Sequence, residues 1–377
     1  MLKKILSALG GLVAAAVSFL LVGLLLVVIL FGTGIPTARP QKESVEVAVG
    51  ERFRMYMTNR ISTALEGVID IEKVYWLSDS DLVAPKPREE NFGTSKDAAS
   101  LQWLLDDAQK LLEGQDTVFS TETPLAPDSE VTYYLDETIF TVTWKQVFDD
   151  SMYTISEVKI AHPSQFRRFL AGGTYGSGIQ LLTTQMADSV NAVVASSGDF
   201  YAHRRYGVIV YDGVVQRSDP KWVDTCFIDD KGDLLFSYRG QLQTMEEAEK
   251  FVEENNIRFS IAFGPVLIDN GQPVTTREYI VGEINEEYAR SALCQMGPLH
   301  YLLVVCARQG NFNDNATLKT FQKVVSTFGP EKAYTLDGGQ TAVIAMRGKP
   351  INRVMFDAQR EISDILYFAT AVPSHEE

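Results

Sequence analysis

Residues 132–148 read TYYLDETIFTVTWKQVF, and residues 152–162 follow as MYTISEVKIAH. Both stretches alternate polar with apolar side chains and are rich in β-branched and aromatic residues, a pattern typical of paired β-strands that bury one face. We therefore expect a sheet to begin here.

More strand patterns continue to the end of the chain, and short helical patterns interrupt them. The strand-like segments are 191–196, 206–213, 232–240, 259–269, 300–310, 342–348 and 362–371. The helix-like segments are 164–171, 183–189, 244–254 and 318–327. Strands and helices mixed in this way predict an α+β domain, a mixed β-sheet with packed helices, over residues 131–377.

Residues 39–130 are predicted to form a membrane-proximal helical region or stalk. A helical rhythm runs through 55–76, a polar loop with prolines occupies 78–96, and 98–112 reads as an amphipathic helix. No constellation of catalytic residues occurs in this region, so its role cannot be inferred from the sequence.

The N-terminus carries the pattern of a membrane anchor. Residues 12–31 read LVAAAVSFLLVGLLLVVILF, and no charged side chain occurs between residues 5 and 38. Twenty helical residues span about 30 Å, the thickness of a hydrocarbon core. Lys3 and Lys4 precede the segment, which predicts a single-pass protein with a cytoplasmic N-terminus in residues 1–38 and an extracytoplasmic remainder. The alternative, a cleaved signal peptide, would have a shorter apolar run and a small-residue cleavage site.

Charge and cysteine content exclude several classes of partner and cofactor. Without Lys3 and Lys4 the net charge is −17, which disfavours nucleic acid and anionic headgroups, so the bilayer would be contacted through the anchor helix alone. Three cysteines are too few for a disulfide framework, although one bridge stays an alternative. Four scattered histidines give no zinc-ligand spacing. No cofactor is predicted; a divalent ion could sit at a carboxylate, but no ligand cluster demands one.

Four segments with glycine, aspartate or arginine follow strand patterns, where a rigid scaffold can support a site. They are SGDFY (197–201), RSAL (290–293), VCAR (305–308) and TLDGGQT (335–341). Their order and spacing over residues 160–371 resemble the phosphodiester glycosidase family, which shows N-G-D/G-F/Y-F/Y, R-T-A-I-G, D-G-R and N-L-D-G-G-G-S-S segments in the same order.

The chain departs from the family pattern at several positions. Ser197 stands in place of Asn, and Cys306-Ala307 in place of Asp-Gly. Thr335 replaces the Asn before L-D-G-G, and Gln340 replaces the third glycine.

The resemblance implies an extracytoplasmic hydrolase that releases a sugar from a phosphodiester in cell-envelope or exopolysaccharide material. Asp337 and Asp199 would supply the carboxylate chemistry, as nucleophile or base. Arg308 and Arg290 would bind the phosphate, because guanidinium groups offer paired donors to phosphate oxygens. Gly338 and Gly339 would bring backbone amides close to the substrate, with Thr341 beside them.

Each of these residues also has a structural interpretation. Asp199 could cap a turn, Arg290 could pair with the preceding acidic run, and Arg308 could be a surface charge at a strand end. The altered positions favour an alternative function, a catalytically lapsed glycan- or phosphoglycan-binding module on the same fold. Five other residues are weaker candidates. His203, Arg204 and Arg205 form a basic cluster that could meet an anionic substrate, although a solvated loop is preferred; His300 is expected to be structural, and Glu283 is a weaker carboxylate candidate.

Overall fold

The computed structural model describes residues 76–79, 81–111, 115–275, 284–307 and 316–372. The predicted anchor at 12–31 and all but the last residue of the helix predicted at 55–76 lie outside these ranges. Within them, no helix is both long and apolar enough to cross a membrane.

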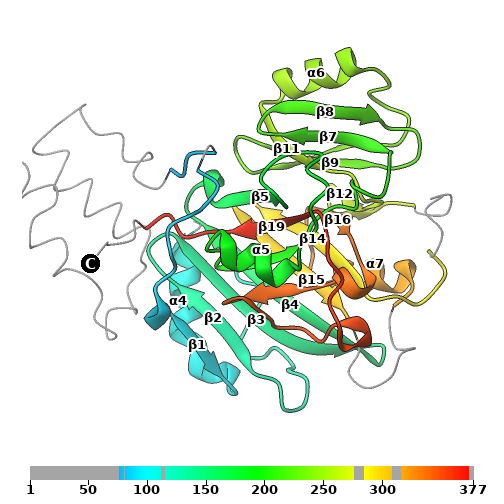
Figure 1. Ribbon diagram of the computed structural model, residues 1–377. Helices are drawn as coiled ribbons and strands as arrows, with labels where there is room; N and C mark the ends of the chain where they lie inside the picture. Colours follow the sequence, from blue (N-terminus) through cyan, green and yellow to red (C-terminus); the bar gives the residue numbers. More distant parts are fainter. Residues whose placement is uncertain (1–75, 80, 112–114, 276–283, 308–315, 373–377) are drawn as a thin grey trace, which may run out of the picture. The chain divides into compact units, whose positions relative to one another are not determined.

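Two antiparallel sheets organise the described residues (Figure 1). The larger has nine strands in the order β1 (Phe92–Ser95), β2 (Val131–Leu135), β3 (Ile139–Phe148), β4 (Ser151–Ile160), β15 (His300–Cys306), β14 (Arg290–Gly297), β16 (Lys332–Leu336), β12 (Val266–Asp269) and β13 (Gln272–Pro273). The second has five strands in the order β18 (Lys349–Pro350), β17 (Ile344–Met346), β6 (Val194–Ser197), β19 (Asp364–Phe368) and β5 (Phe166–Leu170).

The other described elements are two small sheets, four α-helices and five short 3-10 helices. The small sheets are β10 (Leu234–Ser237), β9 (Thr225–Asp229) and β11 (Ile257–Ile261), and the hairpin β7 (Gly207–Tyr211) with β8 (Val214–Asp219). The helices are α4 (Gln102–Leu111), α5 (Thr183–Ser189), α6 (Met245–Glu254) and α7 (Leu318–Thr327). This architecture is the expected α+β class.

The main core lies between the nine-stranded and five-stranded sheets. Alternate side chains of strand β19 pack on its two faces. Leu366 and Phe368 belong to this core, whereas Ile365 and Tyr367 belong to a second cluster that includes Met186 of α5. Successive side chains of a strand point to opposite faces, so an all-apolar strand can be covered on both sides. Helix α6 covers the small sheets through Ala248 and Val252 (Figure 1).

Three of the helices predicted after residue 131 are confirmed, as α5, α6 and α7, but the one predicted at 164–171 is wrong. This segment contains β5, which pairs with β19 from Leu170 opposite Asp364 to Phe166 opposite Phe368. The spacing of Phe166, Phe169 and Leu170 fits a helix equally well, and the long-range pairing decides between the two.

The boundary expected near residue 130 does not separate two bodies. Helix α4 is confirmed within 98–112, but β1, in the stretch predicted as a loop, pairs with β2 across that boundary. Glu157 of β4 accepts hydrogen bonds from the N–H groups of Val118 and Phe119, at 2.8 and 3.0 Å. Residues 92–119 therefore form part of the sheet domain.

Candidate functional site

The candidate site lies where one strand of each large sheet ends. Strand β6 ends at Ser197 and β16 ends at Leu336. The Asp337 N–H donates to the Gly198 carbonyl at 3.1 Å, and the Ser197 hydroxyl donates to the Asp337 carbonyl at 2.9 Å. These two bonds bring together segments that are 140 residues apart in the chain.

Glycines allow this close packing. A Cβ at Gly338 would lie 2.5 Å from the Ala289 carbonyl oxygen, and a Cβ at Gly198 would lie 2.4 Å from a carboxylate oxygen of Asp364. Real Cβ atoms do not approach so closely. Gly339 donates its N–H to Ala289 at 2.8 Å and has φ +63, a conformation that favours glycine. The glycine pair thus fixes the Asp337 turn against β14.

Asp337 is a buried carboxylate in an arginine-lined setting. One of its oxygens accepts the Gly338 N–H at 2.9 Å, and the other lies 2.8 Å from the Arg360 guanidinium. Burial raises the pKa of Asp337 to about 6, while Arg360, the Thr341 hydroxyl and Arg204 oppose part of that rise. A carboxyl with this pKa changes from protonated to ionised as the pH rises through about 6.

The two arginines that lower the pKa of Asp337 also share an aromatic neighbour, Phe200. The guanidinium groups of Arg360 and Arg204 lie 5.1 and 5.4 Å from the centre of the Phe200 ring. Arg204 also donates to the Phe263 carbonyl at 3.0 Å. The Arg360 side chain is 36% exposed, so it can reach a ligand from its place beside Asp337.

Sequence reasoning missed both arginines as site residues. Arg204 lies in a basic cluster that could meet an anionic substrate, but a solvated loop was preferred for it. Arg360 opens the segment REISD (360–364), which resembles the closing strand of bacterial members of the family but was not considered for the site. A further signal was the position of Arg204 three residues after the Phe-Tyr pair of SGDFY.

Thr341, for which the resemblance implies substrate binding, lies beside Asp337. It is fully buried and donates its hydroxyl to the Gly338 carbonyl at 2.7 Å. Its side chain also lowers the pKa of Asp337, so it supports the carboxylate turn rather than facing outward.

The carboxylate of Asp199 points into the protein and away from this setting. It is fully buried, accepts the Ala262 N–H at 2.6 Å, and lies 3.6 Å from the Arg168 guanidinium. The Asp199 N–H donates to Asp364, which in turn bonds Arg168 at 2.7 Å. Burial raises the pKa of Asp364 to about 7, against the attraction of Arg168. This buried group of two aspartates and one arginine holds the loop after β6 on the five-stranded sheet.

Of the two arginines predicted to bind phosphate, the structure describes Arg290. Arg290 donates to the carbonyls of Ala316 and Glu286 at 3.1 and 2.8 Å, and its guanidinium lies 5.7 Å from the Tyr288 ring. It therefore organises the backbone around the start of β14. Arg308 lies outside the described residues, as does Glu283.

Two of the histidines have partners other than Asp337. His300 is buried and lies 2.6 Å from Glu157, in agreement with the structural role expected for it. His203 is exposed and lies 2.9 Å from the Gln180 amide. Cys226, Cys294 and Cys306 are all buried free thiols. Across the described ranges, no group of three or more His, Cys, Asp or Glu side chains could hold a metal ion.

Comparisons with known proteins agree with the resemblance seen in the sequence. Residues 190–369 match the family model of the phosphodiester glycosidases. No curated protein matches the chain.

Three solved structures are similar in fold. The catalytic domain of zebrafish N-acetylglucosamine-1-phosphodiester alpha-N-acetylglucosaminidase, auto-inhibited by its pro-peptide, is 18% identical with a TM-score of 0.49, covering 61% of this chain and 82% of that one. A hypothetical protein from Synechocystis is 15% identical with a TM-score of 0.45, covering 66% and 64%. A putative exported protein from Burkholderia pseudomallei is 12% identical with a TM-score of 0.38, covering 58% and 74%.

Proposed function

We propose, from the membership of residues 190–369 in the phosphodiester glycosidase family, that this chain hydrolyses a sugar 1-phosphodiester with Asp337 as its central carboxylate. One observation carries the proposal: Asp337, whose pKa burial raises to about 6, lies 2.8 Å from Arg360 and within the electrostatic influence of Arg204. A carboxylate paired with one arginine and acted on by the charge of a second suits a reaction that develops positive charge on the sugar and negative charge on the phosphate.

The reaction breaks the bond between the anomeric carbon and a phosphate oxygen. Positive charge develops on the sugar ring and negative charge on the departing phosphate, and a carboxylate stabilises the first. The electron pair of the broken bond leaves with the phosphate, and water supplies the new hydroxyl group. A phosphate ester leaves readily, so cations can assist its departure where other glycosidases need a protonated acid.

Asp337 acts in its ionised form in this scheme. With a pKa of about 6 it is mostly ionised at pH 7, and it can then attack the anomeric carbon or take a proton from water. Arg360 and Arg204 take the phosphate-binding role that the sequence suggested for Arg290 and Arg308. Planar guanidinium groups suit this role because each presents several donors to phosphate oxygens.

The proposed setting is the outer face of a membrane. The uncharged run at 12–31 behind Lys3 and Lys4 supports a single-pass anchor with the sheet domain outside the cytoplasm. The substrate would then be a sugar phosphodiester in cell-envelope or exopolysaccharide material.

A second function, a non-catalytic glycan- or phosphoglycan-binding module, is favoured by one observation. Most glycosidases use two carboxylates, and the second carboxylate proposed from the sequence, that of Asp199, is fully buried against Ala262 and Arg168. A site with Asp337 as its single carboxylate could bind a phosphoglycan without cleaving it.

A substrate panel separates the two functions. The purified full-length chain is offered sugar 1-phosphodiesters that differ in sugar and in alcohol, and released reducing sugar is measured for the wild type and for Asp337→Asn. Release by the wild type alone supports the enzyme. Binding of the same compounds without release, by the wild type and the variant alike, supports the binding module.

A further inference from the structure

A cavity of about 500 Å³ lies apart from Asp337, next to the open edge of the five-stranded sheet. Strand β5, the loop after it, the β7–β8 hairpin and β11 line it. Asp337, Arg204 and Arg360 are not among its lining residues. Its volume is in the range of sites that enclose small molecules.

The arginines that line the cavity are already engaged. Arg258 bonds both carboxylate oxygens of Asp79 and the carbonyls of Pro163 and Phe166. Arg167 donates to the Tyr367 hydroxyl and to three backbone carbonyls. The side chain of Arg168 is fully buried beside Asp364 and Asp199. Arg258 and Arg168 are therefore already paired with carboxylates, and the Arg167 donors are taken by neutral acceptors, so the cavity suits an uncharged ligand better than a phosphate.

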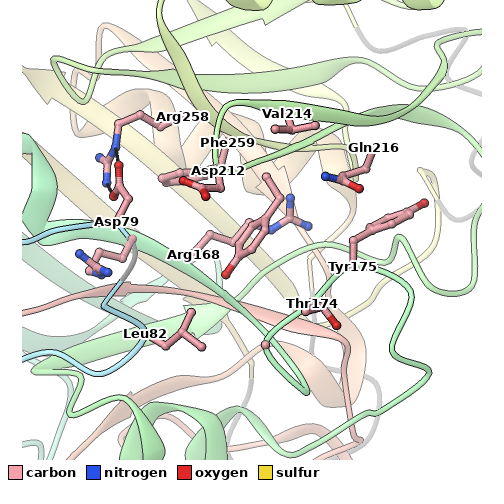
Figure 2. A pocket seen from close by; sticks show the side chains of 13 residues that line it. Asp79, Leu82, Arg168, Thr174, Tyr175, Asp212, Val214, Gln216, Arg258 and Phe259 are labelled. Carbon is pink, nitrogen blue, oxygen red and sulfur yellow. Dashed lines mark hydrogen bonds and ion pairs between the residues drawn. The ribbon is translucent and has the colours of Figure 1, made fainter.

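Five other polar side chains line the cavity, and all but the carboxylate of Asp212 are neutral. No hydrogen bond to another described residue is made by the side chains of Thr174, Tyr175, Tyr211, Asp212 and Gln216. Figure 2 shows the Arg258–Asp79 pair at one end of the cavity and Tyr175, Gln216 and Thr174 at the other. Together they offer donors and acceptors, which a ligand rich in hydroxyl groups can match because each hydroxyl both donates and accepts.

The strand edge adds a backbone donor and acceptor. Ala171 donates to Ser363, and Ala369 donates to Gln165, so the odd-numbered residues of β5 form the hydrogen bonds to β19. The N–H and C=O of Arg168 therefore point away from β19, and neither meets a partner among the residues described. Arg168 lines the cavity, so these groups are available to a ligand there.

Two aromatic rings are held in place beside these polar groups. The Tyr175 ring stacks on Tyr201 with centres 5.2 Å apart, and both Tyr175 and Tyr211 pack against the buried cluster of Leu170, Ile209 and Val223. Rings fixed in this way lose little entropy when a flat apolar surface packs on them. A pyranose presents such a surface, because its C–H groups form apolar faces and its hydroxyls project from the edges.

We propose that this cavity binds a neutral sugar unit of a glycan. Tyr175 and Tyr211 contact the C–H faces, and Asp212, Gln216, Thr174 and the Arg168 backbone bind the hydroxyls. The site is separate from the Asp337 site and does not depend on hydrolysis there. It would hold a glycan chain independently of the phosphodiester.

Sugar titrations of the purified full-length chain test this inference. The probes are glucose, N-acetylglucosamine and glucose 1-phosphate. Their binding is measured by saturation-transfer NMR, with the protein in a detergent that has no sugar head group. A neutral sugar should bind, and Gln216→Ala should weaken it roughly fivefold by removing hydrogen bonds. Tyr211→Ala should weaken it roughly tenfold, whereas Gln272→Ala, an exposed glutamine of β13, should leave it unchanged.

The proposal is overturned if no neutral sugar binds, or if binding of the neutral sugar survives both cavity substitutions. It is also overturned if glucose 1-phosphate binds more tightly than glucose and Tyr211→Ala removes that difference, because the cavity would then recognise the phosphate. Gln216 is exposed, so its substitution leaves the fold intact and keeps the test valid if Tyr211→Ala is unstable. Asp337→Asn should bind the neutral sugar as the wild type does, which separates this site from the proposed hydrolysis.

Discussion

Replacing Asp337 by asparagine should stabilise the protein at pH 8. Burial raises the pKa of Asp337 from 3.8 to about 6, so the folded state holds this proton more tightly than the unfolded state does. Stability linked to the proton is therefore fully present below pH 3.8 and is lost as the pH rises through 6. The shift of about two pKa units corresponds to about 3 kcal/mol above pH 7. Asparagine carries no charge and avoids this cost.

Urea unfolding followed by tryptophan fluorescence measures the effect at pH 8, 6 and 4. We expect Asp337→Asn to exceed the wild type by about 3 kcal/mol at pH 8 and by under about 1 kcal/mol at pH 4. Asp212→Asn, at an exposed carboxylate of the β7–β8 turn, serves as the control and should change little at any pH. If Asp337→Asn is less stable than the wild type at pH 8, then Asp337 serves mainly to hold Arg360 and the following glycines, and the reasoning fails.

Three further substitutions test Arg360 beside Asp337 and the buried group of Asp199 and Arg168. Arg360→Ala should lower kcat/KM roughly 100-fold by removing a donor to the leaving phosphate, and it should shift the acid limb of the pH–rate profile to higher pH because Arg360 lowers the pKa of Asp337. The control Arg353→Ala, at an exposed ion pair, should change neither kcat/KM nor the acid limb. An acid limb that does not move in Arg360→Ala would contradict the assignment. Asp199→Asn should lower the melting temperature but leave kcat within about twofold, because the Asp199 carboxylate is fully buried. A loss of kcat without a loss of stability would show that Asp199 takes part in catalysis. Arg168→Met should lower the free energy of unfolding, measured in urea, by about 3–5 kcal/mol, because two buried carboxylates lose their cation. A decrease under about 1 kcal/mol would mean that these ion pairs contribute little to stability.

The strand content was predictable because it depends on local alternation. Segments such as 139–148 and 362–371 carry side chains that fit one or two buried faces, and both contain strands. Segment 164–171 was not predictable in the same way. Its apolar spacing fits a helix, and only the pairing with β19, almost 200 residues later, makes it a strand.

The site was predictable only at the positions where the motif resides. Asp337 was found because two glycines follow it, and the close approach of Gly338 to Ala289 explains why glycine is required there. Arg360 contacts Asp337 from the loop before β19, and Arg204 acts on its charge from the loop after β6; no local pattern indicates that these loops lie near Asp337. The inward orientation of Asp199 depends on Arg168 of β5, in the segment whose secondary structure was predicted wrongly.

The most direct test of the account compares two substrates that carry the same sugar, one a 1-phosphodiester and the other an uncharged alkyl glycoside. Sugar release by the wild type and by Asp337→Asn is measured as kcat/KM at pH 7. The account predicts release from the phosphodiester by the wild type alone and none from the alkyl glycoside, because Arg360 and Arg204 assist only an anionic leaving group. Equal release from both substrates, or release that persists in Asp337→Asn, would contradict it.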